Sequence, residues 1–208
     1  MQILVLDHPL AHHKLALLRD RRTPVIHFRS LTEELGLLLA VEATRNLATE
    51  TAEVETPLEK TSGRMLANHD PALVPVLRAG LGLVPPFLKL LPTAKVGHIG
   101  MYRDHATLKP VPYYRNFPPM LESRAVYLLD PMLATGGSAS EAIQEVKDAG
   151  AKNITLVAVI AAPEGLARLE KDHPDLRVVV GAVDRGLNEH GYILPGLGDS
   201  GDRTYGTI

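Results

Sequence analysis

Residues 126–139 read VYLLDPMLATGGSA, and the order of residue types in this stretch predicts a strand, a tight turn and the start of a helix. The apolar run 126–129 is typical of a strand that is covered on both faces. Pro131 has no N–H to donate, so we expect strand pairing to stop there. Residues 139–149 are typical of a helix, and Gly150 supplies its C-terminal stop.

The small residues of the turn predict an anion site. A glycine-rich turn at a helix N-terminus directs several backbone N–H groups at one point, and a phosphate monoester suits such a point. Thr135 and Ser138 can add hydroxyl donors, and the small side chains allow a phosphate to approach the backbone. The spacing differs from the G-x-x-x-x-G-K-[ST] phosphate loop and lacks its lysine. The alternative is an ordinary strand-to-helix loop with a capping serine.

Length and composition indicate one globular domain, with 208 residues, of which 45% are hydrophobic and 22% are charged. The formal net charge of −2 indicates no general attraction to nucleic acid or to an anionic membrane. The absence of cysteine excludes a disulfide framework and a zinc–thiolate site. The first residues lack the pattern of a signal peptide, and no apolar run reaches membrane-spanning length, so we expect a cytoplasmic protein.

The first seventy residues show no motif that is typical of a catalytic or binding site. Residues 3–6 predict a short strand, and residues 51–56 predict an exposed strand. A helix is predicted over residues 25–48, with Thr23 as its N-cap and Pro24 at its first position.

A metal site built by the protein is not expected. His8 and His12 stand four residues apart, as two ligands on one helix face do, but Pro9 between them argues against a helix there. No third ligand is evident from the spacing.

Strands and helices alternate from residue 72 onward, and this alternation predicts an α/β fold with a largely parallel sheet. Ligands of such sheets bind beyond the C-terminal strand ends, where Arg78, Arg103 and Asp130 stand. The proline-containing segment 102–124 predicts a long hairpin or flap. The predicted strands are 72–77, 95–101, 126–129, 153–161 and 177–183, and the predicted helices are 83–91, 139–149 and 163–171.

Residues 186–208 are rich in glycine and polar residues, and they show neither a helical period nor a clear strand pattern. Four glycines between residues 191 and 201 allow the backbone to fold closely around a flat group. The apolar residues of this segment indicate that it is packed down rather than free; they are Tyr192, Ile193, Leu194 and Leu197.

Four blocks of the chain resemble the uracil phosphoribosyltransferase family, in the family's order. The blocks are VLRAGLG at residues 76–82, GMYRD at 100–104, DPMLATGGS at 130–138 and PGLGDSGDR at 195–203. The resemblance covers nearly the whole chain. It implies transfer of the 5-phosphoribosyl group from phosphoribosyl diphosphate (PRPP) to N1 of uracil, giving UMP and diphosphate, as in pyrimidine salvage.

The implied architecture is a phosphoribosyltransferase-type, mainly parallel sheet flanked by helices, with a flap hairpin and a C-terminal hood. We expect a single domain over residues 1–208. It would consist of an N-terminal extension over about residues 1–70, a core over about 71–185 and a base-binding hood over about 186–208.

The resemblance also implies roles for individual residues. Arg78 and Arg103 would hold the diphosphate, and Asp199 would lie near the ribosyl donor, so these three are the expected catalytic residues. Uracil would contact Ile193, Gly198, Asp199 and Ser200. The expected PRPP-binding residues are Arg78, Arg103, Asp130, Pro131, Met132, Leu133, Ala134, Thr135, Gly136, Gly137, Ser138 and Asp199.

Simpler interpretations of these polar residues stay open. Arg78 could be a surface arginine that pairs with a nearby acid, and Arg103 could pair in the same way with Asp104. Asp199 and Asp202 could merely form turns in a glycine-rich loop.

Mg²⁺ is the implied cofactor, bound through the diphosphate and not directly by the protein, because hard cations readily bind substrate phosphates. Arginine suits a diphosphate leaving group because it stays charged and offers a planar fork of donors. The implied partners are PRPP and uracil, with neither nucleic acid nor a membrane. The resemblance further implies a homo-oligomer, either a dimer or a tetramer, and allows a GTP effector that makes the enzyme allosteric.

The sequence departs from the family pattern in two places, and two rival functions stay open. Pro131 and Ala134 stand where many phosphoribosyltransferases have further acids, which favours uracil as the base, and Ser200 stands where many members have alanine. An RNA-binding pyrimidine regulator on the same scaffold is one rival, although it would need a basic face. A dinucleotide-binding domain is the other, because residues 80–82 nearly begin a G-x-G-x-x-G motif, but Pro85 replaces its third glycine.

Overall fold

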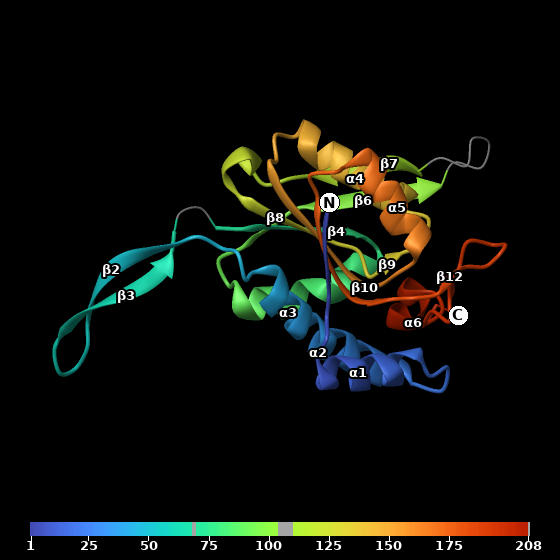
Figure 1. Cartoon of the computed structure of the whole chain (residues 1–208), viewed down its shortest axis with the longest axis horizontal. Coiled ribbons are helices and arrows are strands. Elements are labelled where there is room, and N and C mark those ends of the chain that lie inside the picture. The colour runs from blue at the N-terminus through green and yellow to red at the C-terminus, as the bar shows by residue number, and fades with distance from the viewer. Residues whose placement is uncertain (68–69, 104–109, 208) are drawn as a thin grey trace.

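The computed structural model describes residues 1–67, 70–103 and 110–207, with the backbone alone at Arg103. Its centre is a sheet with the order β1-β11-β10-β8-β4-β6-β7 (Figure 1). These strands are β1 (Gln2–Val5), β11 (Arg177–Val183), β10 (Asn153–Ala161), β8 (Ala125–Leu129), β4 (Ala72–Leu77), β6 (His98–Arg103) and β7 (Pro110–Asn116). Short strands β5 (Lys95–Val96) and β9 (Met132–Leu133) pair with β4 and β10.

Every neighbouring pair in the sheet is parallel except β6 and β7, which form an antiparallel hairpin. The prediction of a mainly parallel α/β sheet is therefore confirmed. The tip of the predicted flap, residues 104–109, lies outside the described residues. Strand pairing resumes after Pro131, where Met132 and Leu133 pair with β10, so the expectation that pairing stops at this proline was wrong.

Helices cover both faces of the sheet (Figure 1). Alternate strand residues belong to the two cores on either face. On one face, Leu73, Leu129 and Val157 pack under α1 (Pro9–Arg19), α2 (Val25–Ala43) and α3 (Val84–Leu90). On the other face, Val74 and Leu128 pack under α4 (Gly137–Asp148) and α5 (Pro163–Asp172). The central strands are buried on both sides, which explains their continuous apolar runs. Among the helices that the structure describes, none is long and apolar enough to cross a membrane.

Helix α1 was not predicted, because Pro9 was taken as evidence against a helix. Instead Pro9 occupies the first helical turn, where its missing N–H costs nothing, and the His8 ring nitrogen accepts a hydrogen bond from the Leu10 N–H at 3.1 Å. Helix α2 begins where it was expected but ends at Ala43. The predicted N-cap was also wrong, since Thr23 donates its hydroxyl to the Leu17 carbonyl of α1 and no side chain caps the start of α2.

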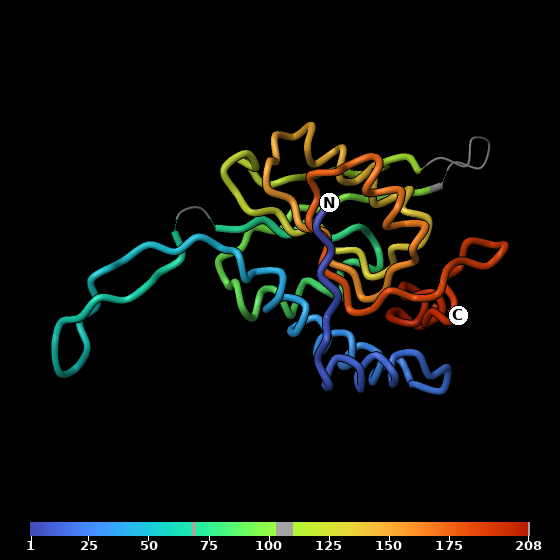
Figure 2. Tube along the Cα trace, in the orientation of Figure 1, coloured from blue at the N-terminus to red at the C-terminus, as the bar shows by residue number. Residues whose placement is uncertain are grey.

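A two-stranded arm leaves the body of the molecule between α2 and β4 (Figures 1 and 2). It is formed by β2 (Thr49–Glu55) and β3 (Lys60–Leu66), paired antiparallel. The sequence predicted only the first of these strands. Both strands are largely exposed on both faces, so β3 carries no alternation of apolar and polar residues from which to predict it.

The C-terminal segment contains two short strands and a short helix. Strands β12 (Gly186–Leu187) and β13 (Ile193–Leu194) pair antiparallel, and α6 (Ser200–Tyr205) follows them. The sequence shows no helical period here because α6, with six residues, is too short to show one. As expected, Ile193 and Leu197 are buried, but Tyr192 is 54% exposed.

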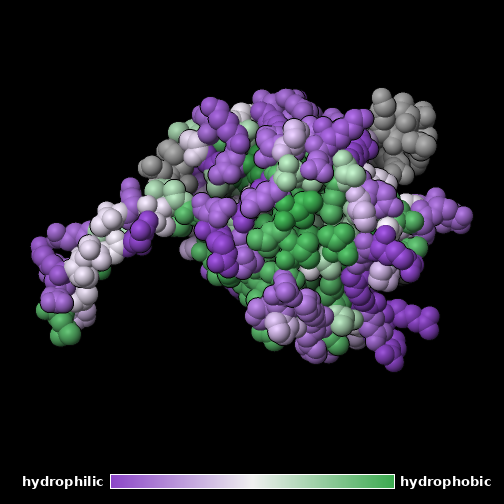
Figure 3. Space-filling model, in the orientation of Figure 1, coloured by the Kyte–Doolittle hydropathy of each residue, from purple (hydrophilic) through white to green (hydrophobic). Residues whose placement is uncertain are grey.

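The face of the molecule in Figure 3 carries apolar side chains near its centre, over the edge strand β1. Ile3 and Val5 belong to this strand and are 42% and 47% exposed. Polar side chains surround this area and cover the helices at the rim of the same view (Figure 3).

Candidate active site

Three cavities adjoin at the C-terminal ends of β4 and β8, and Met132 lines all of them. The loop cavity, of about 170 Å³, is lined by Asp130, residues 132–139 and Gly191. The hood cavity, of about 230 Å³, is lined mainly by residues 191–193 and 198–201. The strand-end cavity, of about 300 Å³, is lined by residues 76–79, Met101, Asp130, Met132, Ser138, Asp199 and Gly201.

The loop cavity is formed by the backbone at the N-terminus of α4. The Ser140 N–H donates to the Gly136 carbonyl at 2.8 Å, which is the first hydrogen bond of this helix. The N–H groups before it are therefore directed at the cavity, as at the start of any α-helix. Gly137 N lies 3.5 Å from Thr135 Oγ1, at the limit of a hydrogen bond. The helix dipole adds partial positive charge, so the cavity suits an anion.

Gly136 is needed for a reason other than the expected one, which was that small side chains let a phosphate approach the backbone. Its φ is +76°, a left-handed conformation that glycine adopts without strain. A Cβ atom at this position would lie 2.9 Å from the Gly165 carbonyl oxygen, on the side of α5 rather than in the cavity. The glycine therefore permits the turn and its close approach to α5, and the idea that it mainly admits the phosphate was wrong.

Asp130 lies between the loop cavity and the strand-end cavity, and it lines both. Burial raises the pKa of its carboxyl from 3.8 to about 6, while a hydrogen bond from the Met132 N–H opposes that rise. That bond is long, at 3.4 Å, so the carboxylate has spare accepting capacity. Hydroxyl donors of a ligand would find an acceptor here.

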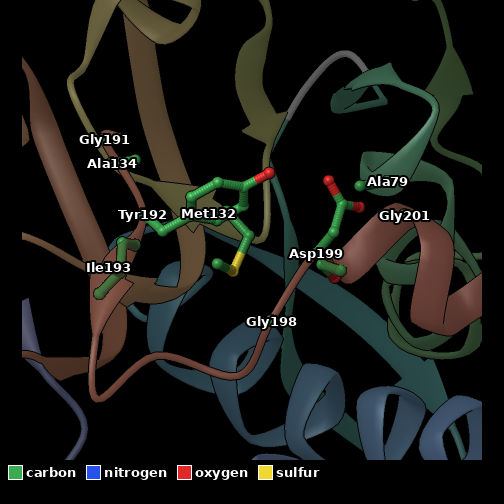
Figure 4. Close-up of a pocket in the computed structure, with 10 residues that line it drawn as sticks. Ala79, Met132, Ala134, Gly191, Tyr192, Ile193, Gly198, Asp199 and Gly201 are labelled. Carbon is green, nitrogen blue, oxygen red and sulfur yellow. The ribbon is translucent and has the colours of Figure 1, made fainter. Parts of the chain in front are cut away.

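The hood cavity has Tyr192 and Ile193 on one side and Gly198, Asp199 and Gly201 on the other, with the Met132 side chain between them (Figure 4). Ile193 and Ser200 are 4% and 5% exposed, so they contribute to a fixed wall. Gly198 has a φ of +80°, which fits the expected close folding of a glycine-rich backbone.

Asp199 serves a structural role and also lines two cavities. Its Oδ1 accepts a hydrogen bond from the Asp202 N–H at 2.9 Å and so caps α6. The same residue lines the hood cavity and the strand-end cavity. The turn-forming interpretation is therefore confirmed, and the site interpretation, which fits the two cavities, stays a prediction.

Arg78 follows β4 and lines the strand-end cavity. Its side chain is 59% exposed, and its Nη2 lies 3.5 Å from Asp202 Oδ1. The Tyr205 hydroxyl donates to the Arg78 carbonyl at 3.1 Å, which joins α6 to the end of β4. A long, exposed ion pair contributes little to stability, so the pair with Asp202 leaves the guanidinium able to bind a ligand.

Arg103 ends β6, the neighbour of β4, but its side chain lies outside the described residues, as does Asp104. Pro131 lies behind the loop, where its carbonyl accepts hydrogen bonds from the N–H groups of Val159 and Ile160 at 3.0 and 3.1 Å. The other loop residues that the family resemblance implies all line the loop cavity.

The first glycine of the near match to a dinucleotide motif, Gly80, serves the packing of strands. Gly80 lies in a 3-10 helix, Ala79–Leu83, directly after β4. A Cβ atom there would collide with the Leu129 carbonyl oxygen of the neighbouring strand. Close approach of two backbones therefore explains this glycine.

Several lining residues were not predicted from the sequence. Tyr192 was read as a packing residue, and its position next to Ile193 was the signal that could have placed it in the site. Met101 and Ala79 belong to strand ends and turns whose meeting depends on the order of strands in the sheet. The unpredicted lining residues are Val76, Leu77, Ala79, Met101, Ala139, Gly191, Tyr192 and Gly201.

The oxygen atoms at the site would hold a hard cation only if oxygen atoms of a substrate completed its coordination. Within residues 1–67, 70–103 and 110–207, no three histidine, cysteine or acidic side chains converge to hold a metal. Asp130 and Asp199 both line the strand-end cavity and offer oxygen atoms, the ligand type that Mg²⁺ prefers. The residues present therefore fit Mg²⁺ that is bound largely through a substrate.

Comparison with known proteins places this geometry in a family. A family model described as uracil phosphoribosyltransferase matches residues 5–207. A uracil phosphoribosyltransferase of Thermus thermophilus is 56% identical over 207 residues, with 100% of both chains covered. That of Thermoanaerobacter sp. is 52% identical over 205 residues, covering 99% of this chain and 98% of its own.

Solved structures have the same fold. A protein from Aquifex aeolicus has a TM-score of 0.92 and 40% identity, with 98% of both chains covered. An adenine phosphoribosyltransferase from Trypanosoma brucei, with a TM-score of 0.59 and 14% identity, covers 91% of this chain and 87% of its own, and it is similar in fold alone. The chain, matched along almost its whole length, belongs to the uracil phosphoribosyltransferase family.

Proposed function

We propose that the three cavities are subsites of a single active site for phosphoribosyl transfer. The chain catalyses the transfer of the 5-phosphoribosyl group from PRPP to N1 of uracil, giving UMP and diphosphate. The observation that carries the proposal is that Met132 lines all three cavities. A phosphate, a diphosphate and a base that bind in them would therefore be contiguous, as the parts of PRPP and uracil must be for transfer.

The loop cavity is the proposed site of the 5′-phosphate. Backbone N–H groups at the start of α4 would donate to its oxygens, with the hydroxyls of Thr135 and Ser138 in reach. Asp130 lies at the junction with the strand-end cavity, where it would accept hydrogen bonds from the ribose hydroxyls. The ribose would thus be oriented between the two cavities.

The strand-end cavity is the proposed diphosphate site. Negative charge grows on the diphosphate as the glycosidic bond breaks, and Arg78, together with Arg103, would stabilise that charge. Mg²⁺, bound through the diphosphate, would neutralise further charge on the leaving group. Asp199 lines this cavity and the hood cavity, so its carboxylate would face the positive charge that develops on the sugar.

The hood cavity is the proposed uracil site. Its wall between Gly198 and Ser200 is rich in backbone, and amides and carbonyls can pair with the edge of a planar base. A site built to pair with uracil leaves buried groups unpaired when cytosine binds, which penalises the wrong base strongly. Tyr192 and Ile193 would border the ring.

Several properties implied by the family remain proposals for this chain. We propose a homo-oligomeric enzyme of one domain, located in the cytoplasm, with GTP as a candidate effector. The family relation supports these proposals, and sedimentation with and without GTP, alongside initial rates, tests the oligomer and the effector together.

The test of the function is a base panel. Diphosphate release is measured with PRPP, Mg²⁺ and, in turn, uracil, cytosine, hypoxanthine and orotate. Turnover with uracil alone is expected. Turnover with another base at a comparable rate would contradict the proposed uracil site.

Ser200→Ala tests how the base is read. The hydroxyl belongs to a buried residue of the hood cavity, while backbone groups are proposed to pair with uracil. We expect KM for uracil to stay within about threefold of the original value, since uniform binding is retained. A much larger rise would place the hydroxyl in direct contact with the base.

A further inference from the structure

Three charged side chains from distant parts of the chain bind the backbone of residues 196 and 197, next in sequence to the hood cavity; we call Arg19, Asp184 and Arg203 the hood clamp. Arg19 is the last residue of α1, Asp184 follows β11 and Arg203 lies in α6. The Asp184 side chain is 3% exposed, and Arg203 is 9% exposed as a residue. Charged residues are rarely buried to this extent unless they are paired.

The first half of the clamp holds both backbone groups of Gly196. Arg19 forms two hydrogen bonds with the Asp184 carboxylate, one of them from Nη1 to Oδ2 at 2.7 Å. The same Nη1 donates to the Gly196 carbonyl at 2.8 Å, and the Gly196 N–H donates to Asp184 Oδ2 at 2.9 Å. The ion pair therefore binds the two peptide units on either side of the Gly196 Cα.

The second half of the clamp holds the next residue of the loop. Arg203 Nη1 donates to the carbonyls of Leu197, at 2.8 Å, and of Leu18. Its Nη2 donates to the Asp20 carbonyl at 2.7 Å, and its guanidinium carbon lies 4.4 Å from the centre of the Phe28 ring. One arginine thus joins the loop to the end of α1 and to α2.

The held segment has little intrinsic order. Gly196 and Gly198 have φ values of +65° and +80°, and no long strand or helix fixes residues 195–199. Glycine gains the most conformational freedom when it is released, so side chains that fix this backbone do most to define its shape. Three of its polar backbone groups are bound by the clamp, immediately before Gly198, Asp199 and Ser200 of the hood cavity.

Stability alone does not explain a clamp of this kind. Removing charges from water costs energy that pairing only partly offsets, and well-packed apolar residues often serve stability equally well. Here each arginine donates to a carbonyl of the loop as well as to acceptors elsewhere in the chain. A fixed loop, by contrast, requires directed donors and acceptors.

We propose that Arg19, Asp184 and Arg203 are positioning residues that hold residues 196 and 197, and through them the adjoining Gly198, in the shape that binds uracil. The N-terminal helix α1 is then part of the support of the base site and not only a covering of the sheet. The inference rests on the proposed function of residues 193–200 as the base-contacting segment. None of the three clamp residues lines the cavities, so they act through the loop.

The test compares Arg19→Gln with Arg177→Gln. Arg177 is a matched control, because it is also partly buried and donates to two backbone carbonyls, those of Ala43 and Glu42, at 2.6 and 2.9 Å. It begins β11, at the end of the sheet opposite the site. Initial rates with varied uracil and varied PRPP, and thermal unfolding, are measured for both variants.

For Arg19→Gln we expect KM for uracil to rise roughly tenfold or more, with KM for PRPP within about twofold, because small misplacements of a binding group are costly. Arg177→Gln is expected to lose thermal stability but to keep both KM values. Arg19→Lys keeps the charge but cannot form the same fork, so an intermediate KM for uracil is expected. Arg19→Lys also provides the comparison if the glutamine variant fails to fold.

The proposal is overturned if the Arg19 variants raise KM for uracil no more than Arg177→Gln does, or if they raise the two KM values equally. Gly198→Ala separates this failure from that of the base site. Gly198 has a positive φ within the loop, so the alanine distorts the loop directly. A raised KM for uracil in Gly198→Ala alone rejects the clamp, and no change in either variant rejects the base site as well.

Discussion

Asp130 shows at the scale of one residue how position alters chemistry. It follows a strand buried on both faces, and burial raises the pKa of its carboxyl from 3.8 to about 6. Between these two values the folded protein binds more protons at this group than the unfolded chain does. The contribution of Asp130 to the free energy of unfolding therefore falls as the pH rises from about 4 to about 6. At higher pH the ionised carboxylate destabilises the folded protein by the full, constant amount.

We predict that Asp130→Asn stabilises the free enzyme at about pH 7.5, by at most about 3 kcal/mol, because the buried charge is removed. The gain should shrink as the pH falls toward about 4. The same variant should lose most of its affinity for PRPP, since the amide accepts ribose hydroxyls less strongly. Thermal unfolding over this pH range and calorimetry with PRPP check both outcomes.

Asp70→Asn is the matched control for this prediction. A hydrogen bond from Thr93 holds the pKa of the half-buried Asp70 carboxyl below its ordinary value, so removal of this carboxyl should not stabilise the protein. An equal gain in both variants would show that Asp130 carries no special cost. An unchanged affinity of Asp130→Asn for PRPP would remove this residue from the ribose site.

Arg78 presents the opposite case, an exposed residue with little structural function. We predict that Arg78→Ala lowers kcat/KM by about 10²–10³, because a fixed charge that faces the leaving group is removed. The free energy of unfolding should change by less than about 1 kcal/mol, since the ion pair with Asp202 is long and exposed. Diphosphate release and urea unfolding measure the two effects.

Arg64→Ala on the exposed arm is the control, because among the described residues the side chain of this arginine donates only to Thr49 at the surface. It should leave both activity and stability unchanged. An Arg78→Ala enzyme that retains activity within about threefold would show that another group stabilises the leaving group.

At the scale of elements, the loop between β8 and α4 depends on one glycine conformation. We predict that Gly136→Ala destabilises the protein by about 1–3 kcal/mol, because its φ is +76° and its Cβ would meet the Gly165 carbonyl. PRPP affinity should fall with it, since the N–H groups that form the loop cavity shift. Chemical unfolding and calorimetry with PRPP give the two readouts.

Gly150→Ala provides the control at the other end of the same helix. Gly150 also has a positive φ, of +103°, but open space lies around its Cβ position apart from Glu122. This variant should lose stability and retain PRPP affinity. Equal losses of affinity in the two variants would mean that the loop geometry has no special part in binding.

The elements that the sequence predicted are those that local rules determine. The β8–turn–α4 unit has a buried apolar run, a proline, glycines and a helical segment in sequence, and β10 and β11 were predicted with their correct bounds. Helix α1 was missed because Pro9 was read as a breaker instead of a first-turn residue. Strand β3 and helix α6 were missed because an exposed strand and a six-residue helix leave no periodic pattern.

At the scale of the whole molecule, the site depends on contacts that no local rule predicts. Residues 2–5 pair with residues 177–180, and Arg29 of α2 donates to the Thr204 carbonyl of α6 at 2.7 Å. Alternating strands and helices predict a parallel sheet but not its strand order. Resemblance to a family supplied the residues proposed to contact the ligands, whereas the proposed supporting residues Arg19 and Asp184 follow only from the folded chain.

The central claim is that three adjoining cavities form one site for phosphate, diphosphate and uracil. A crystal structure of the enzyme with UMP tests it most directly. The claim predicts the 5′-phosphate at the backbone N–H groups of residues 135–139 and the uracil ring between Ile193 and Ser200. A uracil ring outside the hood cavity, or a phosphate held by side chains elsewhere, would contradict it.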